Sequence, residues 1–304
     1  MAKRKSGLDI HGIMLLDKRT GISSNHALQE VRRLLNANKA GHTGSLDPLA
    51  SGLLPLCFGE ATKVSALMLD DDKRYQVSIR LGIMTDTGDC EGKIILEMPI
   101  PEISPAVLLQ CLHSFTGEIT QIPPMYSALK HQGKKLYELA REGKTVDRAA
   151  RLIKIHNIDL LSFDDEIITL DVSCSKGTYI RSLAEAIGVY LNCCATVIAL
   201  RRTEAGIFSL AQAHSWDQLQ HLDPAELTNL LIPVDAPLQQ IPLVKLSQAQ
   251  AESIHQGQQI VLSGYAPGSV RMYYQQIFLG LGEILLNDKL APKKIFNLQH
   301  RPVC

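Results

Sequence analysis

Two segments far apart in the chain alternate strictly between apolar and polar side chains. One runs from Tyr75 to Leu81 and the other from Ile168 to Cys174. A period of two places successive side chains on opposite faces, which is typical of a strand with one buried face. Helical patterns lie between such strands, but without the regular strand–helix alternation of a doubly wound sheet. The sequence therefore predicts an α+β fold.

Capping residues and short apolar runs place further elements. Ser23 or Ser24 is expected to cap a helix, because serine accepts a hydrogen bond from the free N–H groups of the first turn. Thr178 is expected to cap a second helix, whose apolar face covers residues 180–191. A short strand is expected over residues 197–200, ending where two arginines follow.

Three prolines between residues 233 and 243 predict a crossing between two domains. After them come a helix-like segment from Ser247 to His255 and several short alternating stretches. A length of 304 residues agrees with about two domains. We expect a larger domain over residues 1–240 and a small β-rich one over residues 241–304.

Charge is balanced overall but uneven along the chain. The 31 basic and 31 acidic residues give no net charge, which excludes a uniformly basic nucleic-acid binder. Between Tyr126 and Ile155, eight basic residues outnumber three acidic ones, a local charge of +5. Two basic patches on a neutral body suit a polyanion of defined shape. The second patch, in the last sixteen residues, consists of Lys289, Lys293, Lys294 and Arg301.

Several classes of protein are not expected. No apolar run approaches the ~20 residues of a membrane span, and no signal peptide follows the basic N-terminus. The seven cysteines include no CxxC pair, which indicates a reducing compartment. The ten histidines form no HExxH motif, so a helical metal site is not expected. We expect a soluble cytoplasmic protein without a metal or cofactor.

A glycine-rich loop from Gly41 to Gly52 is the main candidate site. Its glycines and its Asp-Pro pair allow sharp bends and leave His42 and Asp47 projecting. An aspartate in such a loop can act as a nucleophile. It can also be only the N-cap of a helix that begins at Pro48. The residues alone do not choose between the two.

An arginine beside this aspartate would hold the carboxylate ionised and fixed in orientation. Arg181, near the start of the second predicted helix, is one candidate, and Arg201 and Arg202 are the alternatives. The sequence leaves the three open. Lysines, glycines and Tyr137 alternate between residues 123 and 143, which indicates either a solvated loop or a basic flap that closes on phosphates.

A set of short motifs, taken together in their order and spacing, resembles the tRNA pseudouridine synthase B family. The resemblance covers about residues 12–205, and its most specific motif is the block from Gly41 to Gly52. In the tail, two further segments resemble the small RNA-binding barrel that ends family members. The motifs are Leu16-Asp17-Lys18 with Gly21-Ile22-Ser23-Ser24, Gly41 to Gly52, Lys73-Arg74-Tyr75, Thr85-Asp86-Thr87-Gly88-Asp89, Ile122 to Lys130, Lys176 to Arg181 and Leu200-Arg201-Arg202, and in the tail Leu281 to Ile284 and Ala291 to Lys294.

The resemblance implies both a fold and an activity. It implies a mixed-sheet pseudouridine synthase domain over residues 1–240, with a thumb-like basic insertion at about 123–155, and a PUA-like RNA-binding domain over residues 241–304. The implied reaction converts uridine at position 55 in the T-loop of tRNA to pseudouridine. The implied partner is the T-arm of tRNA, with no membrane, guide RNA or protein partner. No cofactor is implied, because the isomerisation neither oxidises nor removes anything.

The resemblance also implies roles for individual residues. Asp47 corresponds to the catalytic aspartate, and Arg181 to the arginine that pairs with it. Tyr75 corresponds to a tyrosine that stacks on the target base and is a candidate for the C5 proton transfer. Three more residues complete the implied substrate site: Tyr179 lining the pocket, Leu200 contacting the uracil, and His42 filling the gap left by the flipped nucleotide.

Basic residues of the insertion are expected to bind the RNA backbone. Two rival interpretations remain: a guide-RNA-dependent relative, and a tRNA-binding or folding protein in which chemistry is secondary. Guide-dependent members lack the long basic flap that this chain has, and an intact Asp47, Tyr75 and Arg181 set argues against a purely binding role. The expected backbone-binding residues are Lys130, Lys134, Lys135, Arg141 and Arg151.

Overall fold

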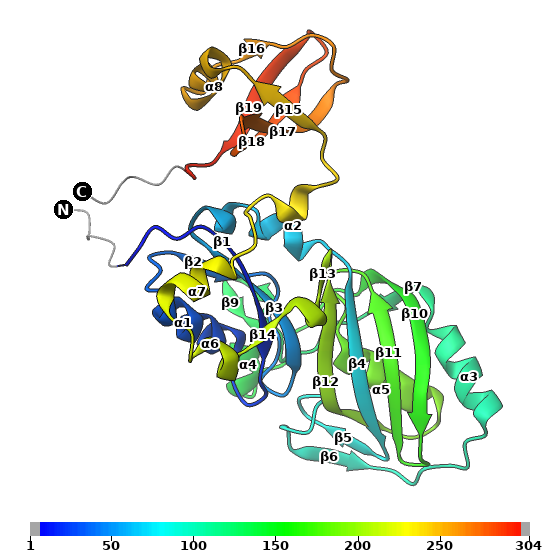
Figure 1. Ribbon diagram of the computed structural model, residues 1–304. Helices are drawn as coiled ribbons and strands as arrows, with labels where there is room; N and C mark the ends of the chain where they lie inside the picture. Colours follow the sequence, from blue (N-terminus) through cyan, green and yellow to red (C-terminus); the bar gives the residue numbers. More distant parts are fainter. Residues whose placement is uncertain (1–6, 299–304) are drawn as a thin grey trace.

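A ten-stranded mixed sheet forms the framework of the larger of two bodies (Figure 1). The computed structural model describes residues 7–298. The main strand order is β14-β1-β3-β12-β4-β11-β10-β7, with β2 beside β3 and β13 beside β12. The strands are β1 (Gly12–Lys18), β2 (Ala40–His42), β3 (Ser51–Phe58), β4 (Lys73–Leu81), β7 (Gly117–Gln121), β10 (Arg151–Phe163), β11 (Ile167–Cys174), β12 (Ala195–Ala205), β13 (Phe208–Ser209) and β14 (His214–Ser215).

The pairing within this sheet confirms the predicted α+β class. Most neighbours are antiparallel, including β4 with β11 and β4 with β12. Only β1 with β14 and β3 with β12 pair in parallel. The sheet is therefore mixed and not doubly wound.

Helices pack on the sheet and form two neighbouring hydrophobic cores with it. The helices are α1 (Ser24–Leu34), α2 (Ser65–Leu69), α3 (Pro105–Ser114), α4 (Leu136–Arg141), α5 (Ile180–Tyr190), α6 (Trp216–Leu219) and α7 (Pro224–Asn229), with 3-10 turns at Gly59–Lys63, Leu210–Gln212 and Ala236–Leu238. One core packs α3 and α5 on β4, β10, β11 and β12, and the other packs α1 on β1 and β3. Tyr75 and Leu200 contact both cores, so they lie where the two halves meet.

Two of the expected local features are wrong. Ser23 caps α1 as predicted, accepting a hydrogen bond from the His26 N–H at 3.2 Å. The second helix, however, has Tyr179 at its N-cap, because the Thr178 hydroxyl donates to the Ser175 carbonyl of its own turn at 2.9 Å. The strand expected to stop at residue 200 continues as β12 to Ala205, pairing with β4 beyond the two arginines.

The basic insertion connects β7 to β10. We call residues 122–150 the flap; it contains the short hairpin β8 (Lys130–His131) and β9 (Lys134–Lys135), followed by α4. The insertion was expected to reach residue 155, but residues 151–163 form β10, whose buried side chains Ile153 and Ile155 belong to the sheet.

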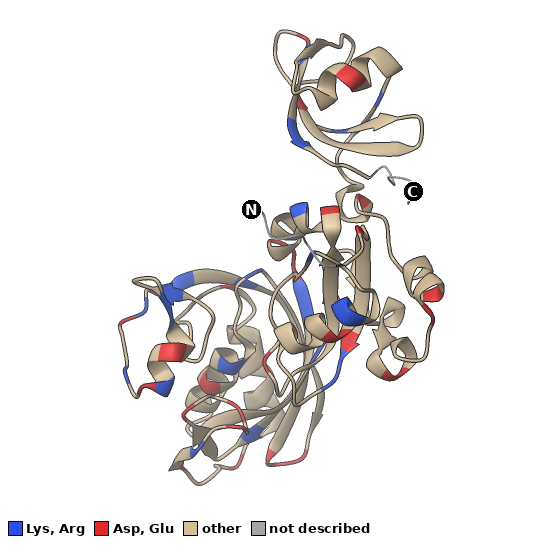
Figure 2. Ribbon diagram, turned by 90° about the vertical axis from the view of Figure 1, so that its left-hand side faces the viewer, with Lys and Arg blue, Asp and Glu red and all other residues tan. Residues whose placement is uncertain are grey.

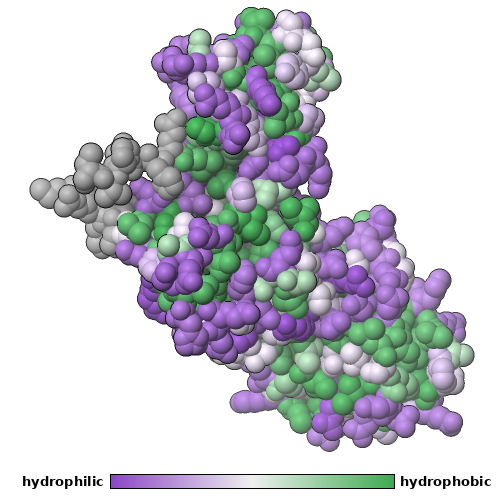
Figure 3. All heavy atoms as spheres, in the orientation of Figure 1, coloured by the Kyte–Doolittle hydropathy of each residue, from purple (hydrophilic) through white to green (hydrophobic). Residues whose placement is uncertain are grey.

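A second hairpin, β5 (Ile83–Thr85) with β6 (Ile94–Glu97), projects from the lower end of the larger body. Its exposed apolar residues contribute to the hydrophobic surface at that end (Figure 3). They are Ile94, Ile95 and Leu96, followed by Met98.

The smaller body is a five-stranded sheet with one helix, which confirms the predicted β-rich tail. Its order is β15-β17-β18-β19-β16. Figure 2 shows positive and negative residues interspersed over both bodies. Arg301 and Cys304 lie outside the described residues. The elements are β15 (Leu243–Leu246), α8 (Gln248–His255), β16 (Ile260–Val261), β17 (Gly268–Tyr274), β18 (Ile277–Ile284) and β19 (Lys289–Ile295).

Contacts tie the two bodies together. The Tyr273 hydroxyl of β17 donates to the carboxylate of Asp235, which lies within the crossing. On the other side, the Lys63 ammonium donates to the Ile295 carbonyl at 2.7 Å, and the Lys294 ammonium donates to the Lys63 carbonyl at 2.8 Å. Within residues 7–298, none of the helices is long and apolar enough to cross a membrane.

Candidate active site

The loop between β2 and β3 carries Asp47 and is held in place by the start of α1. The Ser24 hydroxyl donates to the Leu46 carbonyl at 3.0 Å and accepts from the Leu46 N–H at 2.7 Å. The Gly21 N–H donates to the Pro48 carbonyl at 2.8 Å. Hydrogen bonds therefore hold the main chain on both sides of Asp47, at Leu46 and at Pro48. The motif at residues 21–24 supplies the partners of these bonds.

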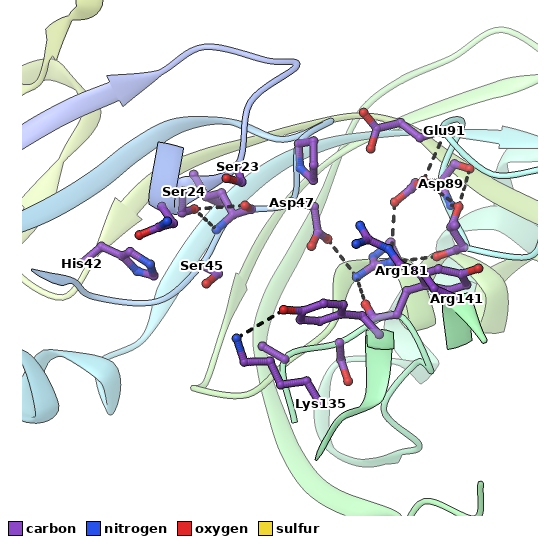
Figure 4. A pocket seen from close by; sticks show the side chains of 18 residues that line it. Ser23, Ser24, His42, Ser45, Asp47, Asp89, Glu91, Lys135, Arg141 and Arg181 are labelled. Atoms are coloured by element: carbon purple, nitrogen blue, oxygen red, sulfur yellow. Dashed lines mark hydrogen bonds and ion pairs between the residues drawn. The ribbon is translucent and has the colours of Figure 1, made fainter. Parts of the chain in front are cut away.

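Asp47 does not cap a helix, because no helix begins at Pro48. Its carboxylate, which is buried over more than half of its surface, instead lies 2.9 Å from the guanidinium of Arg181, the second residue of α5 (Figure 4). The two alternative arginines have other partners. Arg201 pairs with Asp17 at 2.7 Å, and the buried Arg202 donates to the Leu53 carbonyl at 2.7 Å.

Arg181 is buried and joins four groups. Besides Asp47, its guanidinium lies 3.6 Å from a carboxylate oxygen of Asp89 and donates to the carbonyls of Thr87 at 2.8 Å and Tyr126 at 2.7 Å. The side chains of Arg181 and Asp89 are each only 5% exposed. A planar guanidinium can make all these contacts at once, which an ammonium cannot.

Asp89 was not predicted as a site residue, although its motif Thr85 to Asp89 contributed to the resemblance. The Thr87 hydroxyl donates to its carboxylate at 2.7 Å, and the Glu91 N–H donates to the same oxygen at 3.2 Å. The turn that orients Asp89 is local, but its contact with Arg181 joins residues that are far apart in the chain. A sequence without contact information offers no signal for that pairing.

The environment of Asp47 shifts its pKa upward. Burial raises the pKa of Asp47 above its ordinary value of 3.8, Asp89 raises it further, and the charges of Arg181 and Lys18 oppose the shift. Lys18 is itself fully buried, and burial lowers its pKa to about 8. Its ammonium donates to the carbonyls of Arg19 and Ile22 at 2.9 and 2.8 Å. Arg181 therefore orients the carboxylate and only partly offsets its burial.

Five of the predicted residues line one pocket of about 290 Å³. They come from separate parts of the chain: the loop, β4, the start of α5, and β12. Burial raises the pKa of Tyr75, so its hydroxyl is neutral at neutral pH. The pocket residues are Asp47, Tyr75, Tyr179, Arg181 and Leu200.

A larger cleft of about 670 Å³ lies between the loop, α1 and the flap, and shares Asp47 and Arg181 with this pocket. His42 lines this outer cleft, half-buried on β2, with a buried Nδ1 that has no hydrogen-bond partner. Burial and the nearby charge of Arg202 lower the pKa of His42, so the ring is neutral. A neutral aromatic ring at the mouth of the pocket can replace a base in a stack.

The five basic residues predicted to bind RNA backbone fall into different settings. Lys135 and Arg141 line the outer cleft. The Lys135 Nζ lies 5.3 Å and the Arg141 Cζ 5.4 Å from the centroid of the Tyr137 ring. Lys130 and Lys134 lie exposed on the hairpin, and Lys134 is 3.6 Å from Glu142. Arg151 is half-buried at the base of the flap, with its guanidinium 4.9 Å from the centroid of the Tyr179 ring.

Among residues 7–298, no cluster of three or more His, Cys, Asp or Glu side chains is close enough together to hold a metal ion. The side chains gathered at the inner pocket include a carboxylate, a guanidinium and two phenols. The basic flap faces the cleft.

Family models match almost the whole chain. The model for the TruB family pseudouridylate synthase (N terminal domain) matches residues 32–180. The model for the tRNA pseudouridylate synthase B C-terminal domain matches residues 181–239, and that for Pseudouridine synthase II TruB, C-terminal, matches residues 242–296.

Curated relatives are similar over their full length. The tRNA pseudouridine synthase B of Chromohalobacter salexigens is 49% identical over 300 residues, covering 98% of both chains. That of Pseudomonas aeruginosa is 48% identical over 296 residues, covering 94% of this chain and 96% of the relative.

Among solved structures, a Cbf5–Nop10–Gar1 complex contains a chain with the same fold. The TM-score is 0.69 at 22% identity, covering 94% of this chain and 84% of that chain. A chain of an H/ACA RNP bound to a substrate RNA containing 2′-deoxyuridine also matches, with a TM-score of 0.69 at 20% identity and coverage of 98% and 92%. At these identities the likeness concerns the fold alone.

Proposed function

This chain belongs to the TruB family of pseudouridylate synthases, and we propose that its active centre is the pocket of Asp47, Tyr75, Tyr179, Arg181 and Leu200. The activity is that of a tRNA pseudouridine synthase, the isomerisation of uridine 55 in the T-loop of tRNA. The observation that carries the assignment of the centre is the 2.9 Å pair between Asp47 and Arg181 at the pocket wall.

The reaction conserves every atom of the substrate. The bond from ribose C1′ to uracil N1 breaks, the uracil turns, and a new bond joins C5 to C1′. The proton on C5 leaves, and N1 ends with a proton. Asp47 can attack C1′ or the base, or assist the departure of uracil, and each route uses its ionised carboxylate. Tyr75 is the group we assign to the C5 proton transfer: because its hydroxyl is neutral, the oxygen takes up the C5 proton as it passes its own proton on.

The remaining roles follow the shape of the two cavities. Tyr179 and Leu200 enclose the flipped uracil, and His42 occupies the place that the nucleotide leaves. We assign residues 1–240 to catalysis and residues 241–304 to a PUA-like RNA-binding domain. The flap supplies RNA contacts from the same chain, so we propose that no guide RNA or protein partner is needed. We also propose a cytoplasmic location, because tRNA is the substrate.

The position is tested with two transcripts of one elongator tRNA that differ only at nucleotide 55. The purified chain should form pseudouridine in the transcript with uridine at 55 and none in the transcript with cytidine there. Product in the cytidine transcript would assign the enzyme to another uridine.

The flap lysines are expected to act through phosphate charge. Replacing Lys130, Lys134 and Lys135 together with glutamine should weaken tRNA binding and flatten the dependence of log K on log salt by somewhat under one unit for each phosphate that is no longer neutralised. The rate at saturating tRNA should change less, because these side chains lie outside the inner pocket. Dissociation constants of parent and variant across a salt series provide the measurement.

A matched control removes three exposed positive charges outside the flap. Lys39, Arg80 and Lys93 are exposed and line neither cavity. Their glutamine variant should keep the parent's slope. Equal slopes for parent and flap variant would instead mean that the three flap lysines are a solvated face.

The raised pKa of Asp47 predicts where activity fails in acid. The ionised carboxylate is the active form, and burial with the Asp89 charge shifts its protonation above pH 3.8. The rate at saturating tRNA should therefore fall on acidification before an ordinary aspartate would be protonated. A pH–rate profile measured at saturating tRNA checks this. A rate that stays constant down to about pH 4 would contradict the assignment.

A further inference from the structure

The two ends of the flap meet at the base of the sheet. Gln121 is the last residue of β7 and Arg151 the first of β10, and they are direct cross-strand partners. All of residues 122–150 lie between them in sequence. Both side chains reach the same residue, Tyr179, which precedes α5.

Gln121 holds the main chain of Tyr179 at two points. Its side-chain amide donates to the Tyr179 carbonyl at 3.0 Å and accepts from the Tyr179 N–H at 2.8 Å. Gln121 is only 6% exposed. Tyr179 is the N-cap of α5 and has an extended main chain, so no earlier helical turn is present to bind its N–H. The amide of Gln121 takes that role.

Arg151 holds the ring of Tyr179. Its guanidinium lies 4.9 Å from the ring centroid, within the range of a cation–π contact. Gly177, with a φ of +78°, leaves room for it, since a Cβ at that position would lie 3.2 Å from Arg151 Nη1. The glycine two residues before Tyr179 thus serves both the turn and the approach of the guanidinium.

The guanidinium has few other contacts. Its Nε and Nη2 are buried and have no hydrogen-bond partner among the described residues. A buried cation that is not paired with an acid gains most from the face of an aromatic ring. The ring of Tyr179 is therefore its main contact.

We propose that Gln121 and Arg151 are positioning residues that hold Tyr179 for the reaction and couple it to the flap. The sequence predicted that Arg151 binds a phosphate of the RNA backbone. In this proposal it instead acts on the reaction through Tyr179. The flap is tied to α5 at two further points, since Arg181 donates to the Tyr126 carbonyl at 2.7 Å and the Ser182 hydroxyl donates to the Ile122 carbonyl at 3.2 Å. This inference rests on the proposed role of Tyr179 in the pocket.

A double-mutant cycle tests the proposal. Arg151→Met keeps the length and apolar stem of the side chain and removes the cation. It should lower the single-turnover rate at saturating tRNA by about 2- to 30-fold, the worth of a cation–π contact. In a Tyr179→Leu background the same change should have no further effect, because the residue it positions is gone. The salt dependence of tRNA binding should equal the parent's.

Further variants separate positioning from folding. Gln121→Glu keeps the acceptor for the Tyr179 N–H but loses the donor, and it should lower the same rate without moving the salt slope. Arg80→Met removes an exposed cation of β4 and should leave the rate unchanged. Thermal melts of all variants must match the parent for the rates to be compared, and Arg151→Gln, which also removes the cation, replaces Arg151→Met if the latter melts early.

Three results would overturn the proposal. One is a rate loss that is equally large with and without Tyr179. Another is a salt slope that flattens in Arg151→Met, which would make Arg151 a phosphate ligand. The third is parent-like turnover in Tyr179→Leu. None of them affects the assignment of Asp47, which is tested separately.

Discussion

Asp47→Asn is expected to abolish pseudouridine formation, by at least about 10⁴-fold, as removal of a group that acts in the bond-making step does in other enzymes. Asparagine keeps the shape of the side chain but carries no negative charge. Binding of tRNA should be retained, because the flap is unchanged and asparagine fills the same space in the outer cleft. The measurement is pseudouridine per tRNA in a single turnover, alongside a binding titration.

The same variant should fold at least as stably as the parent. The pKa of Asp47 is higher in the folded protein than in the unfolded chain. The folded protein therefore loses stability as the pH rises from the unfolded pKa through the folded pKa, and at pH 7 the ionised carboxylate opposes folding. A neutral amide removes this cost, and Arg181 keeps Asp89 and two carbonyls as partners. The melting temperature at pH 7 should equal or exceed that of the parent. Turnover close to the parent's rate would instead make Asp47 a structural residue of the loop.

Arg181→Lys is expected to lower the rate by about 10²- to 10³-fold, comparable to the loss of one preorganised donor at a reacting charge. The guanidinium contacts Asp47, Asp89 and two carbonyls in one plane, and an ammonium on a flexible stem cannot satisfy that set. Single-turnover rates at saturating tRNA give the comparison.

Arg201→Lys is the matched control, since this arginine pairs with Asp17 and is half-exposed. A partly exposed pair contributes little, so the rate should stay within about fivefold of the parent. If Arg201→Lys loses as much activity as Arg181→Lys, the partner of the catalytic carboxylate has been misassigned.

Local patterns predicted the elements of the fold well. The two alternating segments form β4 and β11, and Ser23 caps α1. These features depend on side chains within one strand or one turn, which is the range over which a sequence carries its own information. The extent of β12 was mispredicted because Arg201 and Arg202 were taken to end a strand. Their partners, Asp17 and the Leu53 carbonyl, are distant in the chain.

The site shows the same division between local and long-range information. The glycine-rich loop singled out Asp47, but the residues alone left three arginines open as its partner, and only the family resemblance pointed to Arg181. The choice of Arg181 depends on where α5 begins relative to the loop, and Asp89 joins through a separate turn. The hold of Gln121 on Tyr179 links residues that are separated by the whole flap. Contacts of this range follow from the assembled sheet and from no short pattern.

The most direct test of the account is the reaction of this one purified chain with one unmodified elongator tRNA transcript, with no other protein or RNA present. Pseudouridine is mapped at every uridine after a single turnover. The account predicts about one pseudouridine per tRNA, at position 55 of the T-loop, and none when Asp47 is replaced by asparagine. Absence of product until another RNA or protein is added, or equal product from the Asp47→Asn variant, would contradict it.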